Sequence, residues 1–399
     1  MTSDLLITTN PANAAFQMPA VRPPADPRPA LRAMTQEEIV ALLKDNGQQA
    51  FRGKQVYHWI QKKGAVDFDE MGNIPKDLKA WLSENTRFGG MEALATTRES
   101  ADGSVKFLFR LRGGLHIESV LMPGVTHDPL NMTLCVSSQV GCAVDCKFCV
   151  TGANGFFRNM SADEILDQAL TARRFLAEKD DGRRLRNIVF MGMGEPLLNP
   201  DNVIRAIRLM TDSDGMDLSA RRITVSTSGI LPGLEALAQA DTGVGLAISL
   251  NGVTQAEREA VMPITRRYPL SDLLAALKRY PLRNRGRITF EYVLLKGVND
   301  SIKHAHQMAK LLHGIPSKVN VIPFNPDPAL PFERPDREDV EEFATAVATH
   351  NLTVSVRWSK ALDVDGACGQ LAGQYAMKDA KGTRMVIPRY AEAAPVGEG

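Results

Sequence analysis

The stretch that decides the fold is Gly141-Cys-Ala-Val-Asp-Cys-Lys-Phe-Cys-Val150, which places cysteines at positions 142, 146 and 149. This CxxxCxxC spacing offers three thiolates to a metal centre and no fourth. A structural zinc site is closed by four ligands, whereas an iron–sulfur cubane held by three cysteines leaves one iron open to a small molecule. Cys142, Cys146 and Cys149 are therefore predicted to hold one [4Fe-4S] cluster with an open iron. The alternatives are a zinc knuckle and three buried thiols.

The sequence after this loop has the periodicity of an α/β protein. Short β-branched runs alternate with amphipathic stretches, which is typical of parallel βα units. The expected strands are 132–136, 188–191, 223–226, 245–250, 288–294 and 319–323, with a short further strand at 353–358. Six units are too few for a closed eight-stranded barrel. The pattern therefore predicts a partial (βα)6 TIM-like barrel with its site at the C-terminal ends of the strands.

Segments of different composition flank this barrel. The capping box Thr35-Gln-Glu-Glu38 opens a helical region, and Asp102-Gly103 is a hairpin turn signal before an alternating strand from Val105 to Leu111, which a second strand carrying Glu118 follows. The first 30 residues are rich in Pro and Ala and cannot offset the entropy of ordering. The predicted order is a disordered leader (1–30), a small N-terminal helical domain (31–90), a short β-hairpin extension (91–130), the barrel (131–380) and a flexible tail (381–399).

Composition restricts the location and partners of the chain. The 399 residues are 44% hydrophobic, enough for a large core, but none of their apolar runs approaches the ~20 residues of a membrane span. Five cysteines without a disulfide framework fit a reducing compartment, so the cytoplasm is expected. The net charge of +1 does not by itself indicate a nucleic-acid partner.

Polar and glycine residues follow several of the expected strands. In Met191-Gly-Met-Gly-Glu-Pro196 the glycines allow close approach of a ligand, and the Glu195 carboxylate can accept a hydrogen bond from an ammonium group. A plain Gly-Pro turn is the alternative there. The serines and asparagines at later strand ends could orient ribose or adenine, or could merely cap helices and turns. The candidate cofactor-binding residues are Gly194, Glu195, Ser226, Ser249, Leu250, Asn251 and Asn325.

The cysteine motif, with Phe148 just before its last cysteine, resembles the signature of the radical SAM superfamily. The resemblance implies that the open iron chelates S-adenosylmethionine (SAM). An electron from the cluster would then cleave the sulfonium to give a 5′-deoxyadenosyl radical.

Two further cysteines lie outside the motif. Cys135 is within the first expected barrel strand, and Cys368 lies in the glycine-containing stretch Asp365-Gly-Ala-Cys-Gly-Gln370. A buried small side chain and an incidental surface thiol are the alternatives to a chemical role.

Six stretches narrow the resemblance to one family, the RlmN-type RNA adenine C2-methyltransferases, over about residues 31–380. They are 133–142, 192–199, 224–229, 247–250, 321–326 and 366–371. The resemblance implies that one SAM methylates Cys368 and a second supplies the radical that abstracts a hydrogen from that methyl group. The carbon radical would add to adenine C2, and Cys135 would release the product through a transient disulfide with Cys368. Glu118 matches the position assigned to proton abstraction, although a solvent-facing glutamate is the commoner case.

The same resemblance implies the substrates and partners. These are C2 of adenine 2503 in 23S rRNA, C2 of adenine 37 in tRNAs, and a low-potential electron donor such as flavodoxin or ferredoxin, with a monomeric protein away from membranes. The alternatives are a C8-adenine (Cfr-like) rRNA methyltransferase and a non-catalytic iron–sulfur RNA-binding protein. Asn251 departs from the family pattern, in which histidine is usual after Ser-Leu.

Basic clusters are the sequence signal for RNA. They occur at 183–186, at 266–267 and most densely at 278–287, with further lysines and arginines at 52–63 in the helical domain. Each could neutralise phosphates, or could simply solvate a helix face. A base in folded RNA must also be exposed or flipped to reach a buried radical site.

Overall fold

The computed structural model describes residues 26–124, 128–283, 286–371, 377–378 and 384–385. Most of the predicted leader (1–30) and most of the predicted tail (381–399) lie outside the described residues. Within the described part, every helix is too short or too polar to cross a bilayer.

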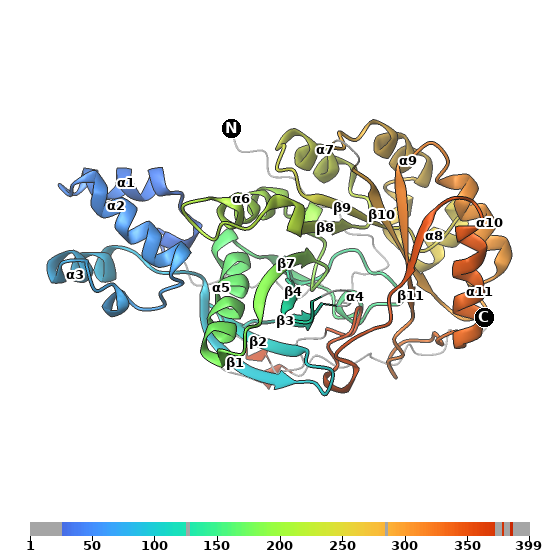
Figure 1. Ribbon diagram of the computed structural model, residues 1–399, viewed down its shortest axis with the longest axis horizontal. Coiled ribbons are helices and arrows are strands. Elements are labelled where there is room, and N and C mark those ends of the chain that lie inside the picture. Colours follow the sequence, from blue (N-terminus) through green and yellow to red (C-terminus); the bar gives the residue numbers. More distant parts are fainter. Residues whose placement is uncertain (1–25, 125–127, 284–285, 372–376, 379–383, 386–399) are drawn as a thin grey trace, which may run out of the picture.

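The N-terminal segment is helical and lies at one end of the molecule, beside the barrel (Figure 1). Its capping box is confirmed, because the Thr35 hydroxyl accepts from the Glu38 amide while the Glu38 carboxylate accepts from the Thr35 amide. Ile39 and Leu43 on this helix are fully buried. The elements are η2 (Leu31–Ala33), α1 (Gln36–Asp45), α2 (Ala50–Tyr57), a π-helical turn η3 (His58–Lys62), η4 (Phe68–Glu70) and α3 (Lys76–Asn85).

One ten-stranded sheet forms the rest of the framework. Its order is β1-β2-β3-β4-β7-β8-β9-β10-β11-β12, antiparallel from β1 to β4 and parallel from β4 to β12. The strands are β1 (Met91–Glu99), β2 (Val105–Leu111), β3 (His116–Pro123), β4 (Asn131–Cys135), β7 (Arg184–Phe190), β8 (Ile223–Thr227), β9 (Gly245–Ser249), β10 (Ile288–Leu294), β11 (Ser317–Pro323) and β12 (Thr353–Val356). The sheet ends at β1 and β12 without closing, so the predicted partial (βα)6 barrel is confirmed.

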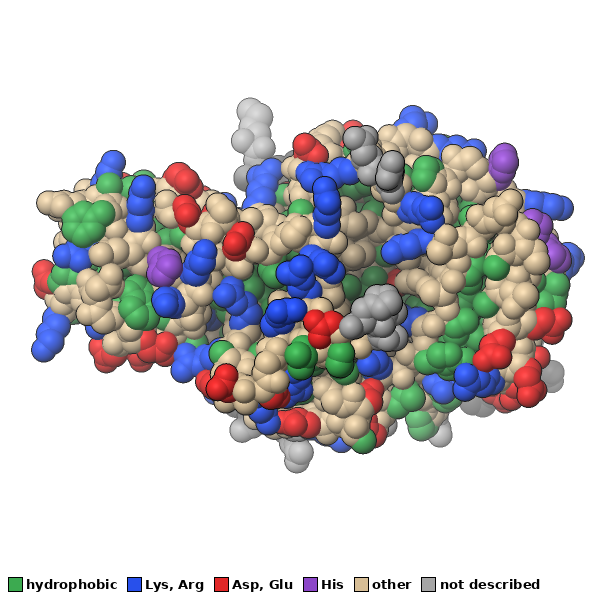
Figure 2. Space-filling view, in the orientation of Figure 1, with side chains coloured by type: hydrophobic (Ala, Val, Ile, Leu, Met, Phe, Trp, Pro, Cys, Tyr) green, Lys and Arg blue, Asp and Glu red, His purple; other side chains and the backbone are tan. Residues whose placement is uncertain are grey.

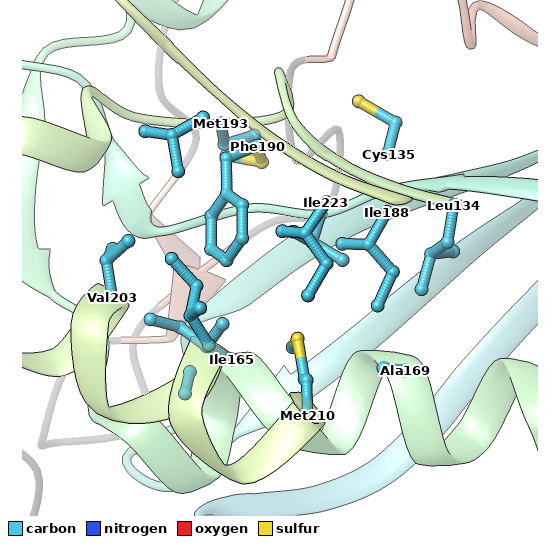
Figure 3. Packing of buried hydrophobic residues seen from close by; sticks show 14 of the residues in the cluster. Leu134, Cys135, Ile165, Ala169, Ile188, Phe190, Met193, Val203, Met210 and Ile223 are labelled. Carbon is cyan, nitrogen blue, oxygen red and sulfur yellow. The ribbon is translucent and has the colours of Figure 1, made fainter. Parts of the chain in front are cut away.

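Helices follow the parallel strands and cover the outer face of the sheet (Figure 1). They are α5 (Ala162–Lys179), α6 (Pro200–Thr211), α7 (Leu231–Gln239), α8 (Gln255–Val261), α9 (Leu270–Arg279), α10 (Ile302–Leu311) and α11 (Arg337–Ala348). Figure 3 shows the Leu134 and Ile188 side chains directed toward these helices, whereas Cys135 points to the opposite face of the sheet. Successive strand residues face opposite ways, so Cys135 faces the interior of the partial barrel.

The described strands that were not expected from the sequence are β1, β5 (Gln139–Gly141), β6 (Phe156–Asn159) and the two-residue strands β13 (Met377–Lys378) and β14 (Arg384–Met385). β1 is almost entirely exposed, so it carries no alternating apolar pattern. β5 and β6 form a short antiparallel pair around the cysteine motif, and β13 pairs with β14. The remaining elements are the short helix α4 (Val150–Ala153) and the 3-10 turns η5 (Pro196–Leu198), η6 (Ala220–Arg222), η7 (Pro263–Arg266) and η8 (Leu362–Val364).

Buried ion pairs join the helical segment to the barrel. Arg32 contacts Asp167, and Arg87 Nη1 lies 2.7 Å from Asp163 Oδ2, with both carboxylates on α5 and almost fully buried. Removing one partner of such a pair leaves an uncompensated buried charge, at a cost of about 3–5 kcal/mol. The helical segment is therefore firmly attached to the barrel.

Candidate active site

The cysteine loop, residues 141–150, is shaped by its immediate neighbours. It begins where β5 ends, at Gly141, whose φ is +73° and where an added Cβ would lie 2.0 Å from the Gly155 carbonyl oxygen. The Cys142 amide donates to that same carbonyl at 2.8 Å. The loop ends at the start of α4, where the Cys149 amide donates to the Cys146 carbonyl. Only glycine fits position 141, so the first ligand has a fixed place.

Cys142, Cys146 and Cys149 line one cavity, which we call the first cavity. Burial raises the pKa of each of the three thiols. Among the residues that the structure describes, no three donor side chains lie close enough together to hold a single metal ion.

Glu195 lies in the segment after β7 and lines the same cavity as these cysteines. It is 4% exposed, and its carboxylate accepts hydrogen bonds from the amides of Leu197 at 3.0 Å and Ser228 at 2.7 Å. Burial raises its pKa. Gly194 precedes it with φ +96°, where a Cβ would lie 2.4 Å from the Gln139 Cβ. Both predicted residues line the first cavity, and Glu195 also ties the end of β7 to the loop after β8.

Buried polar atoms without partners face the first cavity. Ser226 donates to the Glu291 carboxylate at 3.1 Å, and Glu291 is 7% exposed. The other Glu291 oxygen accepts no hydrogen bond, and its nearest cation is Arg357, 3.8 Å away; the Ser228 hydroxyl is also unpaired. Buried polar atoms are normally satisfied, so this lining suits a polar ligand such as SAM. Glu291 was missed, although a glutamate within the apolar strand 288–294 was a usable signal.

Arg258 on α8 joins the ends of two strands beneath this cavity. Its guanidinium is fully buried and donates to the carbonyls of Ser249 and Leu250, at 3.1 Å each, and to that of Ser228. Burial lowers its pKa to about 10. Ser249 lines the first cavity, whereas the predicted residue Leu250 does not, because its side chain is fully buried in the core. No sequence pattern singled out Arg258, since a helix arginine is usually exposed.

The two predicted asparagines are engaged by the protein itself. Asn251, with φ +53°, accepts from the Val293 amide at 2.8 Å and donates to the Met262 sulfur at 3.2 Å. Asn325 donates to the carbonyl of Cys368 at 3.0 Å and accepts from Arg334 at 2.7 Å. Both line the first cavity. Asn325 therefore links the end of β11 to the second reactive cysteine.

Cys368 lies in a loop that is hydrogen-bonded to Val150 and Thr151, at the end of the cysteine loop. This segment, residues 361–371, is called the Cys368 loop below. The Gly369 carbonyl accepts from the Val150 amide at 2.8 Å, and the Leu371 carbonyl accepts from the Thr151 hydroxyl at 2.5 Å. Gly369 has φ +84°, which glycine adopts without strain. Sequence positions more than 200 residues apart thus become neighbours.

A second cavity, of about 610 Å³, lies on the other side of Cys368. Both Cys135 and Cys368 line it, and all five cysteines are free thiols. Burial and the neighbouring Cys368 raise the pKa of Cys135 to about 12. Cys368 and Cys149 line both cavities, and Cys135 lines the second.

Glu118 lies on the same sheet face as Cys135 but lines neither cavity. Val120 on β3 is paired with Cys135, and Glu118 is two residues away along that strand. Its carboxylate, 2% exposed, forms an ion pair of 2.9 Å with the Lys106 ammonium on β2. The structure therefore brings Glu118 to the reactive thiols as a buried, ion-paired carboxylate.

Basic side chains lie in and around the second cavity. Figure 2 shows Lys and Arg side chains gathered around a hollow over the part of the sheet that contains β4, β7 and β8. Arg222, Arg357 and Lys360 line the second cavity, and Arg184, 66% exposed, pairs with Asp128 at its edge. Arg285, within the densest predicted cluster, lies outside the described residues. Arg222, Arg357 and Lys360 were not among the predicted clusters.

Known proteins match both parts of the chain. The model of the radical SAM superfamily matches residues 136–309, and that of the ribosomal RNA large subunit methyltransferase N-terminal domain matches residues 30–87. The dual-specificity RNA methyltransferase RlmN of Anaeromyxobacter sp. (strain Fw109-5) is 47% identical over 355 residues, 88% of this chain and 93% of the relative. RlmN of Acidiphilium cryptum (strain JF-5) is 43% identical, over 92% of this chain and 94% of the relative.

A solved structure agrees with these relatives. The crystal structure of a radical SAM methyltransferase from Sphaerobacter thermophilus superposes with a TM-score of 0.82 and 42% identity, covering 86% of this chain and 99% of that one. Identity of this level over nearly the whole length of each relative, together with the tri-cysteine site in a partial barrel, identifies the family. The chain belongs to the RlmN family of dual-specificity RNA methyltransferases, within the radical SAM superfamily.

Proposed function

We propose that this protein is a SAM-dependent methyltransferase that places a methyl group on C2 of adenine in 23S rRNA and in tRNA. One observation carries the proposal: Cys135 and Cys368, two free thiols outside the cysteine motif, line a single cavity together with Cys149, and Cys368 also lines the cavity of Cys142, Cys146 and Cys149. An iron–sulfur RNA-binding protein without catalytic activity needs no such pair.

The aromatic C2–H explains why two thiols are needed. It is neither acidic nor nucleophilic, so a polar methyl transfer would meet a high barrier. When bound, the cluster and SAM supply methyl groups and one-electron chemistry. Cys368 carries the carbon to the base, Glu118 accepts the proton from C2, and Cys135 attacks the Cys368 sulfur so that the carbon–sulfur bond can break.

Cofactor binding is assigned to the first cavity. Cys142, Cys146 and Cys149 hold the [4Fe-4S] cluster. SAM would contact Gly194, Glu195, Ser226, Ser249 and Asn325, together with the unpaired oxygen of Glu291, and Asn251 would act mainly through the backbone that it fixes. Two SAM molecules are consumed per turnover, because one methylates Cys368 and the other activates that methyl group.

The remaining parts of the proposal concern partners and organisation. The helical segment 31–90 and the basic edge of the second cavity contact RNA phosphates, and residues 91–130 extend the barrel of 131–380 by antiparallel strands. The protein acts as a monomer in the cytoplasm with a flavodoxin- or ferredoxin-type electron donor. Five free thiols support a reducing compartment.

An anaerobic assay tests the function directly. Reconstituted protein is incubated with SAM and a low-potential reductant on 23S rRNA fragments and on tRNA, and digested nucleosides are analysed by mass spectrometry. We expect 2-methyladenosine from both RNAs. An 8-methyladenosine product would instead assign the C8 reaction, and SAM cleavage without RNA methylation would contradict the proposal.

A further inference from the structure

Lys106 is a buried lysine to which the reaction above gives no task. It lies on β2 among apolar residues, and its side chain is only 5% exposed. Lysine is almost never buried at this level without partners. Its ammonium has two of them: the Glu118 carboxylate at 2.9 Å and the main-chain carbonyl of Asp365 at 3.1 Å.

The first partner is the residue proposed to accept the C2 proton. A carboxylate buried without a cation takes up a proton, because the charged form is costly away from water. The ammonium of Lys106, 2.9 Å from the Glu118 carboxylate, is its buried counter-charge and holds that carboxylate in place inside the sheet.

The second partner belongs to the Cys368 loop. Asp365 has φ +51°, a left-handed conformation that costs energy for a residue with a Cβ and must be held by its surroundings. Lys106 bonds the carbonyl of this strained residue, three positions before Cys368. The next residue, Gly366, rests on the sheet, where an added Cβ would lie 3.4 Å from Val120. Val120 is the strand partner of both Lys106 and Cys135.

We propose that Lys106 is a positioning residue that ties the carboxylate of Glu118 to the loop carrying Cys368, so that base and carbon carrier meet beside Cys135. This inference rests on the proposed function, because it assumes that Glu118 accepts the C2 proton. The new element is that one ammonium group, that of Lys106, both holds the Cys368 loop against the sheet and positions the Glu118 carboxylate.

The first experiment measures how fast the covalent protein–RNA adduct is resolved. Adduct is formed with SAM, reductant and RNA, and its decay is followed on denaturing gels. In Lys106→Met, decay should slow by about 100-fold, the lower range for loss of a general base. Lys106→Arg should recover most of the rate. Lys179→Met removes a lysine from an exposed pair with Glu99 and should behave as wild type.

Glu118→Gln is assayed in parallel to separate the two ideas. If its adduct decays at the wild-type rate, Glu118 is not the base and that part of the proposed function is wrong. If its adduct persists while that of Lys106→Met decays normally, the role of Lys106 is wrong.

The second experiment measures the loop in the protein without cofactors. The double variant Lys106→Met with Glu118→Gln leaves no unpaired buried charge, so it also serves if Lys106→Met alone does not fold. Hydrogen exchange in residues 361–371 should accelerate by about tenfold, as expected for loss of a charged hydrogen bond. Glu118→Gln alone keeps the bond from Lys106 to Asp365 and should change the exchange less. Unchanged exchange in residues 361–371 of the double variant would show that Lys106 does not hold the Cys368 loop in place.

Discussion

The cysteine loop and the Cys368 loop both carry cysteines to which the proposed function gives a role, but they are held in place in different ways. The cysteine loop sits between β5 and α4. Its Cys142 and Cys149 amides donate to nearby carbonyls, while the Lys147 and Val150 amides donate to the distant carbonyls of Val261 and Gly369. The Cys368 loop has little regular structure of its own and is bonded by residues from distant parts of the chain. Both loops make distant contacts, but the Cys368 loop depends on distant side chains more heavily than the cysteine loop does. We expect the first to be rigid and the second to move during the reaction.

This difference has a chemical reason. In the proposed reaction, a cluster ligand would stay at one place throughout turnover, whereas Cys368 would first receive a methyl group from the side of the first cavity and then deliver carbon to a base in the second. A loop fixed by a handful of side-chain bonds can open at a cost of a few kcal/mol, since each bond contributes about 1 kcal/mol.

The largest expected effect separates the two loops by metal content. Cys146→Ala leaves only two ligands, so the reconstituted variant should lose nearly all iron and sulfide. Cys368→Ala keeps all three ligands and should retain wild-type amounts. Iron and sulfide analysis after anaerobic reconstitution measures both. Equal loss in the two variants would place Cys368 among the ligands and remove the distinction.

The next effect concerns the two free thiols. Cys135→Ala should accumulate protein covalently joined to RNA, because nothing then attacks the Cys368 sulfur, whereas Cys368→Ala cannot form the bond. Denaturing gels with labelled RNA show the adduct. Absence of adduct in Cys135→Ala would falsify the role given to Cys135.

A third test uses the raised pKa of Cys135. A pKa of about 12, against 9.0 for an ordinary thiol, lowers its thiolate fraction at pH 8 by about 1000-fold. Alkylation of Cys135 in the folded protein should therefore rise about tenfold per pH unit beyond pH 9, whereas in urea it should level off above that pH. Peptide mass spectrometry measures the rates.

The same shift has a consequence for stability. Because the folded state holds the Cys135 proton more tightly than the unfolded state, this contribution is present below pH 9 and is lost as pH rises from 9 toward 12. A folded-state alkylation rate that levels off at pH 9 would contradict the burial of this thiol.

The smallest effect probes the far end of the Cys368 loop. The Asp363 carboxylate accepts from the Ser100 hydroxyl at 2.5 Å and from the Ala101 amide at 3.0 Å, in the turn between β1 and β2. Asp363→Ala should accelerate hydrogen exchange in 361–371 by about fivefold and leave 141–150 unchanged. Asp214→Ala, which removes an exposed bond to Gln36, is the matched control. Altered hydrogen exchange in 141–150, or unchanged hydrogen exchange in 361–371, would contradict this comparison of the two loops.

Elements marked by a local residue pattern were predicted from the sequence, whereas elements without such a pattern were missed. All six barrel strands and the additional edge strand were predicted, because parallel buried strands are marked by β-branched runs. The predicted strand 353–358 ends at Val356, and Arg357 turns into the second cavity instead. The exposed strand β1 has no apolar alternation, and so it gave no signal.

The amino-acid sequence by itself determined the cluster motif, the βα repeat and the helix cap at Thr35, since each depends on neighbours within a few residues. Only the tertiary structure decided that Cys135, Cys368 and Glu118 share one region, that Lys106 and Arg258 are buried, and that Glu291 faces the first cavity. Side chains far apart in sequence meet only after the sheet has set its register, and burial then gives an ordinary lysine, arginine or glutamate its particular electrostatic role.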